Sequence, residues 1–325
     1  MPITTVADIG AAARGAGVQF REFFSQNVMS EITGWEPVVT IRNTDQTVDT
    51  FSGKTGSGTL TRFAEGASIP ALNRYKLYDT AIAVDQYGGQ LTVTRRMLKF
   101  RDWNETFDEF KDLTWSTNTT LSKAPAQIFN GAFANSGVFT LNGIRVTTYA
   151  DGKNLASTAH PRVDGGTAQS NASSGSIPLT EVNFETGRTA LMEQVQDDGT
   201  PIANMGTVYC ILPPKLEKTG LIITGSNLRP ETGNNDVNIY TGGGYIVMSS
   251  VWLSATNSGS DTAWFLVAPK VSKLVLVRSG GPELNQDVDK NTRSMYFSVV
   301  NDFGVGSYDY RGVWCTRGNS VTYSS

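Results

Sequence analysis

Apolar side chains recur at helical spacing in one long stretch of the chain, which runs from Asp102 to about Lys123. One side of such a helix carries Trp103, Phe107, Phe110 and Leu121, with Thr114 and Thr117 in between. Acidic residues gather in its first turns and Lys123 in its last, as the helix dipole favours. The pattern predicts a rod over about 101–124, roughly 33 Å long, which Pro125 kinks or ends.

The chain before this helix is extended and rich in Gly and Thr. Residues 1–34 are weakly helical, with one amphipathic cluster at Phe20, Phe23, Phe24 and Val28. That cluster fits either a helix on the protein's own core or an arm on a neighbouring subunit, and composition does not decide between them. A strand is predicted from Trp35 to Thr50.

A Gly-rich stretch, 52–58, follows this strand and predicts a loop tip. Leu60, Arg62 and Phe63 begin the return arm, so the region is expected to form a long β-hairpin. The run Gly53-Lys54-Thr55 is not a phosphate-binding loop, because that motif needs a glycine where the chain has Val48, and no helix follows. A second hairpin is predicted over 81–93, turning at Gly88-Gly89.

The C-terminal half alternates short helices with buried strands, which is typical of an α+β body. Thr180 is expected to cap a helix that continues to Val195, and Pro213-Pro214 to begin a helix that ends near Ile223. Continuous apolar runs predict strands at 208–212, 245–248, 263–267 and 274–277. The last strand pair is expected from alternation over 295–300, a turn at 301–304 and a return strand at 308–314.

Composition argues against several classes of protein. The charged share is 18% and the formal net charge is −3, so a strongly basic nucleic-acid-binding face is not expected. No stretch approaches the roughly 18 apolar residues of a membrane span, and the N-terminal residues lack the pattern of a signal peptide. Two isolated cysteines, Cys210 and Cys315, are interpreted as buried free thiols.

The sequence gives little support for an enzyme active site. The single histidine, His160, lies three positions after Ser157 without a nucleophile elbow, and we interpret it as a structural residue that closes a turn before Pro161. One histidine cannot supply the ligands of an ordinary zinc site. We interpret Asp197-Asp198 as residues that form a turn rather than as an acid–base pair. The chain is therefore expected to be a structural or interaction protein without cofactor or metal.

Several strings resemble major capsid proteins of tailed double-stranded DNA bacteriophages. They occur in order as Ala64-Glu-Gly-Ala-Ser-Ile-Pro70, Asp151-Gly-Lys-Asn-Leu-Ala-Ser-Thr-Ala-His-Pro161 with Gly165-Gly-Thr-Ala168, Leu228–Ile239, Asp261–Leu266 and Phe303–Gly312. The resemblance implies the Hong Kong 97-type fold, and with it a division into five regions. These are an N-terminal arm (1–47), an extended loop (48–80), a peripheral domain (81–177) with its spine helix at about 101–124, an axial domain (178–270) and return strands of the peripheral domain (271–325).

The function implied by this resemblance is self-assembly into hexamers and pentamers of an icosahedral shell around double-stranded DNA. Scaffolding and portal proteins would be its partners, with a decoration protein as a further candidate, and with assembly in the host cytoplasm and no membrane. Subunit contacts are expected at the loop tip, through Gly53, Lys54, Gly56, Gly58 and Arg62. Trp103, Phe107, Phe110 and Leu121 are expected to pack the spine helix.

The sequence departs from some relatives in two respects. A long N-terminal scaffolding segment is not apparent, which leaves open a separate scaffolding protein or a short version of the segment. Lys54 is the one obvious candidate for a Lys–Asn cross-link, and we interpret it instead as a solvated lysine at the loop tip. Another phage structural subunit (a tail tube or decoration protein) and, less favoured, a hydrolase that uses Ser157 and His160 are the alternatives.

Overall fold

The computed structural model describes residues 6–28, 34–54, 60–71, 76–94, 96–97, 103–202, 205–227, 237–289, 292 and 294–319. Its helices are α1 (Val6–Asn27), α3 (Trp103–Asn130), α4 (Glu181–Met192) and α5 (Pro214–Gly225), with two short 3-10 turns, η1 (Val251–Leu253) and η2 (Ala255–Asn257). Helices and sheets are both present, so the α+β prediction is confirmed.

The largest sheet is built around one long strand, β12 (Met295–Ser307). Its other strands are β1 (Thr40–Asn43), β4 (Asp85–Val93), β5 (Val138–Leu141), β6 (Ile144–Thr147), β10 (Leu274–Arg278) and β11 (Glu283–Val288). The first half of β12 pairs with β4 on one side and β11 on the other, and its second half pairs with β10 and β6. Thirteen residues of strand span about 43 Å, so β12 joins the two ends of the molecule.

The three-stranded end formed by β4, β12 and β11 has one covered face and one open face. Strand register places on the covered face the cross-strand rows Gly89–Val299–Leu284, Leu91–Phe297–Gln286 and Val93–Met295–Val288. The other face, here named the open face, carries the rows Gly88–Val300–Glu283, Gln90–Ser298–Asn285 and Thr92–Tyr296–Asp287. Side chains alternate between faces along each strand, so the register alone separates the two sets.

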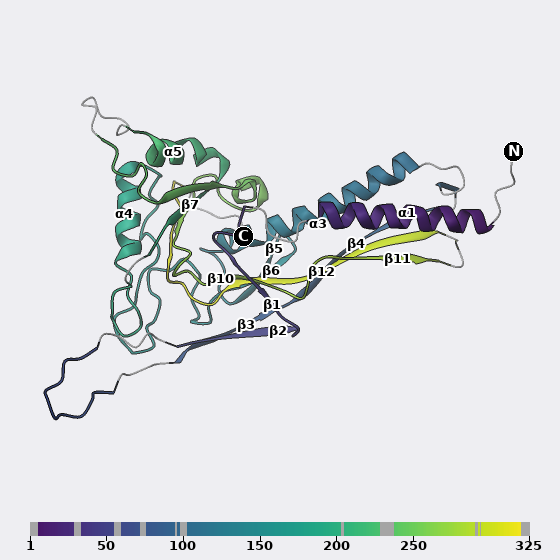
Figure 1. Cartoon of the computed structure of the whole chain (residues 1–325). Helices are drawn as coiled ribbons and strands as arrows, with labels where there is room; N and C mark the ends of the chain where they lie inside the picture. The colour runs from purple at the N-terminus through teal and green to yellow at the C-terminus, as the bar shows by residue number, and fades with distance from the viewer. Residues whose placement is uncertain are drawn as a thin grey trace.

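Helices α1 and α3 lie on the covered face. Phe20 of α1 stacks on Phe110 of α3 with ring centroids 4.7 Å apart, and meets Phe297 of β12 edge-on at 5.0 Å. Phe20, Phe110 and Phe297 are buried with Phe24, Val93, Met295 and Val299 in one cluster. The apolar side of each helix is thus buried against the same sheet, and we call this assembly of α1, the first half of α3, β4, β11 and the first half of β12 the tongue (Figure 1).

Helix α3 does not end at Pro125. It continues to Asn130, so the prediction of a helix ending near 124 was wrong. The residues after the proline, Ala126, Ile128 and Phe129, are fully buried in the largest core cluster. Burial of side chains such as Ile128 and Phe129 stabilises by about 1.5–3 kcal/mol each, which offsets the hydrogen bond that proline removes.

A second sheet lies at the other end of the molecule. Its strands are β13 (Val313–Thr316), β9 (Trp264–Val267), β7 (Val208–Leu212) and β8 (Tyr245–Ser249), in that order. Helix α4 packs against β13, where Gly187 lies close to the Trp314 ring, and α5 packs against β7 and β8, where Gly220 lies close to Leu212 and Val247. A core cluster that includes Phe184, Trp264 and Trp314 holds these layers together.

Most elements predicted for this second half are confirmed. Thr180 caps α4 by accepting a hydrogen bond from the Asn183 backbone N–H, although the helix ends at Met192 rather than Val195. The helix predicted after Pro213 is α5, and the apolar runs form β7, β8, β9 and β10.

Two predicted turns are instead parts of strands. Gly88 and Gly89 lie inside β4, which pairs with β12 along its whole length, so the second hairpin was a wrong prediction. Residues 301–304 lie inside β12, and the return strand β13 belongs to the other sheet. In both places a glycine serves close packing rather than a turn. A Cβ on Gly88 would lie 3.1 Å from the Val299 carbonyl oxygen, and a Cβ on Gly304 would lie 2.1 Å from the Ala83 carbonyl oxygen.

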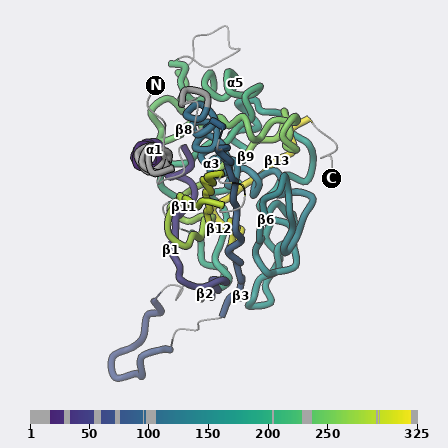
Figure 2. Tube along the Cα trace, turned by 90° about the vertical axis from the view of Figure 1, so that its right-hand side faces the viewer, coloured from purple at the N-terminus to yellow at the C-terminus, as the bar shows by residue number. Residues whose placement is uncertain are grey.

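The predicted hairpin is present with different strands. β2 (Val48–Lys54) pairs with β3 (Lys76–Ala83), so Leu60, Arg62 and Phe63 do not form the return arm. The strand predicted from Trp35 begins later than expected. Trp35 lies in a turn, and β1, the strand before the hairpin, begins only at Thr40. Segment 60–71, which lies between β2 and β3 in sequence, extends away from the body (Figures 1 and 2), on the side opposite the tongue in Figure 1.

Candidate functional site

Segment 60–71 is the described part of the chain between β2 and β3, and each of its residues is exposed. Leu60, Phe63 and Ile69 are 88%, 51% and 79% exposed, and the segment has no helix or strand of its own. Isolated exposed apolar residues are ordinary, but three on one projecting segment suit a surface that another molecule covers.

The stem of this projection is firmly anchored. Phe51 of β2 stacks on Tyr308 at a centroid distance of 4.6 Å, and the Arg42 guanidinium lies 4.8 Å from the Phe51 ring centroid. Arg42 also pairs with the buried carboxylate of Asp49 at 2.8 Å. The base of the loop is therefore fixed to the body while segment 60–71 is exposed.

The residues predicted to form the loop tip do not all lie in one part of the described structure. Gly53 and Lys54 lie in β2 rather than at a tip, and a Cβ on Gly53 would lie 2.7 Å from Leu77 Cδ1 across the hairpin. Gly56 and Gly58 lie outside the described residues. Arg62 is exposed within segment 60–71, and its contact with another subunit stays a prediction.

The predicted spine-helix residues lie on α3. Phe110 is fully buried against Phe20, Phe107 lies at the edge of the same cluster, and Leu121 belongs to the largest core cluster. Trp103 is the first residue of the helix, and its side chain lies outside the description. Sequence reasoning missed Trp115, which is 69% exposed on the same helix.

The sequence analysis also did not identify the open face as a single surface. Glu283, Asn285 and Asp287 of β11 are exposed on it, and the half-exposed Tyr296, Ser298 and Val300 of β12 form its middle row. The period-two alternation over 295–300 was read correctly, and the same alternation in 283–288 is the signal that could have found β11.

Another exposed apolar surface lies on the second sheet's helix α5. Leu221 and Ile222 are exposed there, and a shallow groove of about 590 Å³ runs beside them from Pro214 to Ser226. A helix face of this kind is typical of contacts between proteins.

His160 is buried and fully engaged. Its Nδ1 lies 2.6 Å from Asp151 Oδ2, its Nε2 lies 3.2 Å from Asn171 Oδ1, and its ring stacks on Tyr310. Asn171 Nδ2 donates to the carbonyls of Leu155 and Tyr310, which fixes the orientation of the amide. Ser157 Oγ accepts from the Ala159 N–H, so His160 is bonded to Asp151 and Asn171 rather than to this hydroxyl.

A buried ionic cluster lies beside this histidine. Arg311 pairs with Asp197 at 2.6 Å and with Asp309 at 3.1 Å, and its guanidinium lies 4.7 Å from the Tyr310 ring centroid. Burial disfavours the charged guanidinium, but Asp309, Tyr310 and Asp197 outweigh burial and raise the pKa of Arg311 above its ordinary value. Asp197 is thus an ionic partner of Arg311, in a region predicted only as a turn.

Neither a metal site nor a reactive thiol is found in the described part of the chain. No group of three or more His, Cys, Asp or Glu there could hold a metal ion. Cys210 and Cys315 are buried and free, as predicted, and burial raises the pKa of Cys210 to about 12. Among the described residues, no helix is long and apolar enough to cross a membrane.

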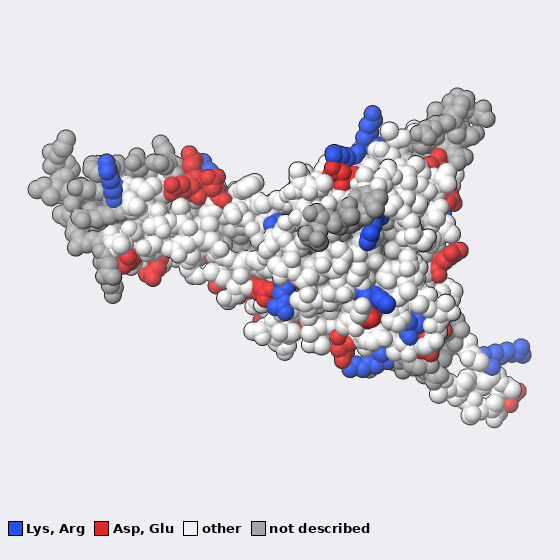
Figure 3. All heavy atoms as spheres, turned by 180° about the vertical axis from the view of Figure 1, so that it is seen from behind, with Lys and Arg blue, Asp and Glu red and all other residues white. Residues whose placement is uncertain are grey.

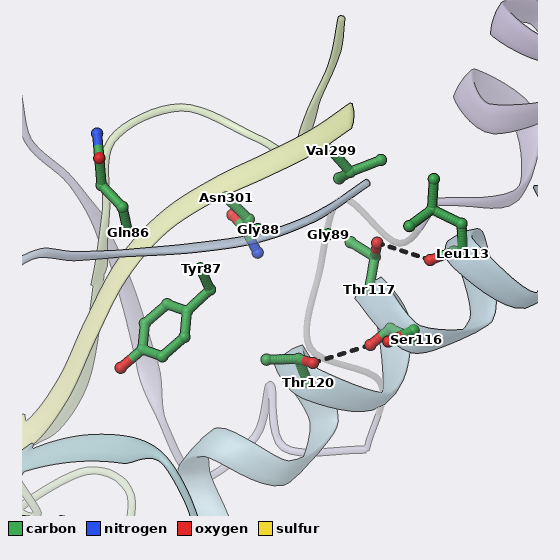
Figure 4. A pocket seen from close by; sticks show the side chains of 10 residues that line it. All are labelled: Gln86, Tyr87, Gly88, Gly89, Leu113, Ser116, Thr117, Thr120, Val299 and Asn301. Carbon is green, nitrogen blue, oxygen red and sulfur yellow. Dashed lines mark hydrogen bonds between the residues drawn. The ribbon is translucent and has the colours of Figure 1, made fainter. Parts of the chain in front are cut away.

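A cavity of about 370 Å³ lies between α3 and the strands β4 and β12 (Figure 4). Thr117 and Thr120 line it, but their hydroxyls donate to the carbonyls of Leu113 and Ser116 within the helix. Gly88, Gly89 and Asn301 line the opposite side, and none of the ten lining residues is an acid or a base at neutral pH. The cavity is a gap in packing without catalytic groups.

Comparison with known proteins assigns the family. A model of the phage capsid protein family matches residues 77–316, so the chain belongs to that family. The match covers the second sheet, the largest sheet except β1, helices α3, α4 and α5, and all but the first residue of β3. A comparison with curated protein sequences finds no match.

Solved structures show the same fold at low sequence identity. A chain of Mycobacterium phage Patience is 11% identical with a TM-score of 0.54, over 98% of this chain and 89% of that one. A chain of the bacteriophage PhiM1 mature capsid is 13% identical with a TM-score of 0.52, over 90% and 88%. A chain of the capsid of Ralstonia phage GP4 is 14% identical with a TM-score of 0.51, over 93% and 92%.

The fold is therefore the Hong Kong 97-type capsid fold, as the resemblance implied. The chain is a phage major capsid protein, a structural component of the virion shell rather than an enzyme. We therefore interpret His160 and the buried ionic cluster around Arg311 as interactions that stabilise the folded subunit.

Proposed function

We propose that copies of this chain join head to tail into rings of five and six, and that these rings close an icosahedral shell. One observation carries the proposal: the molecule projects at two opposite ends, with the loop at one and the tongue at the other (Figure 1). Unlike surfaces at opposite ends make heterologous contacts, and such contacts close into rings when the rotation between copies allows it.

The regions of the chain take separate roles in this assembly. Residues 48–80 form the extended loop that reaches over an adjacent copy, and residues 81–177 with 271–325 form the peripheral domain around α3. Residues 178–270 form the axial domain near the symmetry axes, and residues 1–47 form the arm. The exposed Leu221 and Ile222 of α5 support the axial assignment, because a helix face at an axis is covered by its neighbours.

The shell encloses double-stranded DNA without a strongly basic lining. The formal net charge is −3, whereas proteins that hold DNA tightly place many Lys and Arg against its phosphates. Scaffolding and portal proteins are the partners that assembly of a closed head requires, with a decoration protein as a further candidate.

Expression of the chain alone, and then with its candidate scaffolding protein, tests this function. Light scattering and negative-stain microscopy should show shells or five- and six-fold rings. Tubes would indicate a tail subunit instead. A chain that stays monomeric under both conditions and over a range of salt concentrations would overturn the proposal.

A further inference from the structure

We propose that the cavity between α3 and the strands β4 and β12 binds a neutral, polyhydroxylated ligand of the size of one sugar unit. The inference goes beyond shell assembly and does not depend on it, because it concerns one chain and one small molecule. The cavity volume of about 370 Å³ lies within the range of about 300–1,000 Å³ that is usual for small-ligand sites.

Small residues on both walls leave this space open. Gly89 stands in the covered-face row with Val299 and Leu284, so no side chain fills its place under α3. The helix presents Thr117 and Thr120 to the same space rather than large apolar residues (Figure 4). Protein interiors contain few voids larger than a water molecule, and a polar cavity of this size therefore holds water or a ligand.

One buried donor in the wall has no partner among the described residues. Asn301 is 5% exposed, and its side-chain Nδ2 makes no hydrogen bond there. Asn301 pairs with Tyr87 across the strands, on the face of the sheet that α3 covers, and both residues line the cavity (Figure 4). A buried donor without a partner is costly, so the occupant must offer an acceptor to Asn301.

The threonines of the opposite wall set the complementary requirement. Thr117 Oγ1 donates to the Leu113 carbonyl at 3.0 Å, and Thr120 Oγ1 donates to the Ser116 carbonyl at 2.9 Å. Each hydroxyl has thereby used its one proton, so toward the cavity it can only accept. A ligand must accept from Asn301 and donate to the threonines. A hydroxyl group does both, and several hydroxyls on one small ring serve both walls together.

The remaining lining residues determine the charge of the ligand. None of the ten is an acid or a base at neutral pH, so an ionic ligand would lose its hydration without gaining a counter-charge. A wholly apolar ligand would leave Asn301 unsatisfied. Leu113, Val299 and the Tyr87 ring add apolar surface, which suits the C–H face of a sugar ring. Ser116 lines the cavity and is exposed, so the cavity is open to solvent.

Saturation-transfer NMR of the purified chain tests the site with four probes: glucose, galactose, mannose and N-acetylglucosamine. At least one of these sugars should give transfer signals and a saturable titration. Glucuronate has the ring of glucose with an added carboxylate, and cyclohexanol has a similar ring with one hydroxyl. Both should bind at least about tenfold more weakly than the best sugar, because the first is charged and the second lacks most of the polar groups.

Variants of the two walls assign the binding to this cavity. Asn301→Leu removes the amide at similar size and should weaken sugar binding about tenfold. Thr120→Val removes an acceptor without a change of shape and should weaken binding about three- to tenfold, which keeps the test valid if Asn301→Leu does not fold. Thr119→Val alters a neighbouring residue outside the cavity lining and should bind as wild type. Circular dichroism checks the fold of each variant.

The source of the sugar is separated by a second measurement, on assembled particles with a soluble polymer of the sugar that binds best. Binding of the monosaccharide alone assigns the site to a free sugar, and binding of the polymer as well assigns it to a glycan chain. Either result supports the site. Absence of binding by every probe, or equal binding by wild type, Asn301→Leu and Thr120→Val, would overturn the inference and leave a cavity that holds only water. Tighter binding of glucuronate or cyclohexanol than of any sugar would also overturn it.

Discussion

The imidazole of His160 lies flat on the phenol ring of Tyr310, with ring centroids 3.9 Å apart and an interplanar angle of 1°. The contact joins a loop that follows β6 to the connection between β12 and β13, two segments 150 residues apart in sequence. Both ring nitrogens face oxygen atoms, of Asp151 and Asn171. The histidine therefore ties an irregular loop to the strands of both sheets.

Replacement of His160 by alanine should lower the free energy of unfolding by about 3–5 kcal/mol, because it leaves the buried Asp151 carboxylate without its partner. Urea denaturation of the unassembled chain measures the loss. Lys153→Ala, an exposed change in the same loop, should stay within about 0.5 kcal/mol of wild type. A loss below about 1 kcal/mol in His160→Ala would contradict the structural role.

Gly304 should tolerate no side chain. A Cβ there would lie 2.1 Å from the Ala83 carbonyl oxygen, so Gly304→Ala must push β12 and β3 apart. We expect a loss of about 3 kcal/mol in thermal or urea unfolding. Gly281→Ala is the matched control, since a Cβ at Gly281 meets nothing within 4 Å, and equal effects of the two changes would refute the close approach.

Helix α1 should depend on Phe20 for its place on the tongue. Phe20→Ala removes the ring that contacts both Phe110 and Phe297, and should cost about 3–5 kcal/mol. Limited proteolysis should then cut the chain within α1 faster than in wild type. Val18→Ala on the exposed side of the same helix should change neither measurement, and unchanged cleavage in Phe20→Ala would contradict the packing.

The two cysteines should be unreactive in the folded chain. Burial raises the pKa of Cys210 from an ordinary 9.0 to about 12, so the nucleophilic thiolate is scarce at pH 8. A chromogenic thiol reagent should modify neither residue until denaturant is added, and then both. Rapid modification in the absence of denaturant would show that the second sheet opens.

The same shift has a consequence for stability at high pH. The folded chain keeps the Cys210 proton at pH values where the unfolded chain releases it. Stability is therefore independent of this group below about pH 9 and declines as the pH rises from 9 toward about 12. Cys210→Ser would remove the thiol's contribution to that decline, which pH-dependent unfolding of the two proteins can measure.

Local patterns in the sequence were sufficient for much of the fold. The apolar period of α3, the Thr180 cap and the continuous runs of β7 and β9 depend on neighbours in sequence, and each was predicted. Glycine was the main source of error. At Gly88 and Gly304 it permits close packing between distant strands, and at Gly89 close packing against α3, and no local signal separates that use from a turn.

The candidate site was harder to predict than the fold. The open face depends on the register of β4, β12 and β11, and β4 lies some two hundred positions before the other two strands. The three rows are therefore visible only once the strands are paired. Trp115 was not singled out, although Phe110 and Leu121 of the same helix, which were predicted to pack it, are buried. Exposure of one helical residue depends on what covers it, which periodicity alone does not give.

Cryo-electron microscopy of particles assembled from the purified chain tests the central claim most directly. The account predicts closed shells in which copies of this subunit surround five-fold and six-fold axes. Each projecting segment 60–71 should lie against an adjacent copy. Open tubes, or a chain that remains monomeric with and without its scaffolding protein, would contradict it.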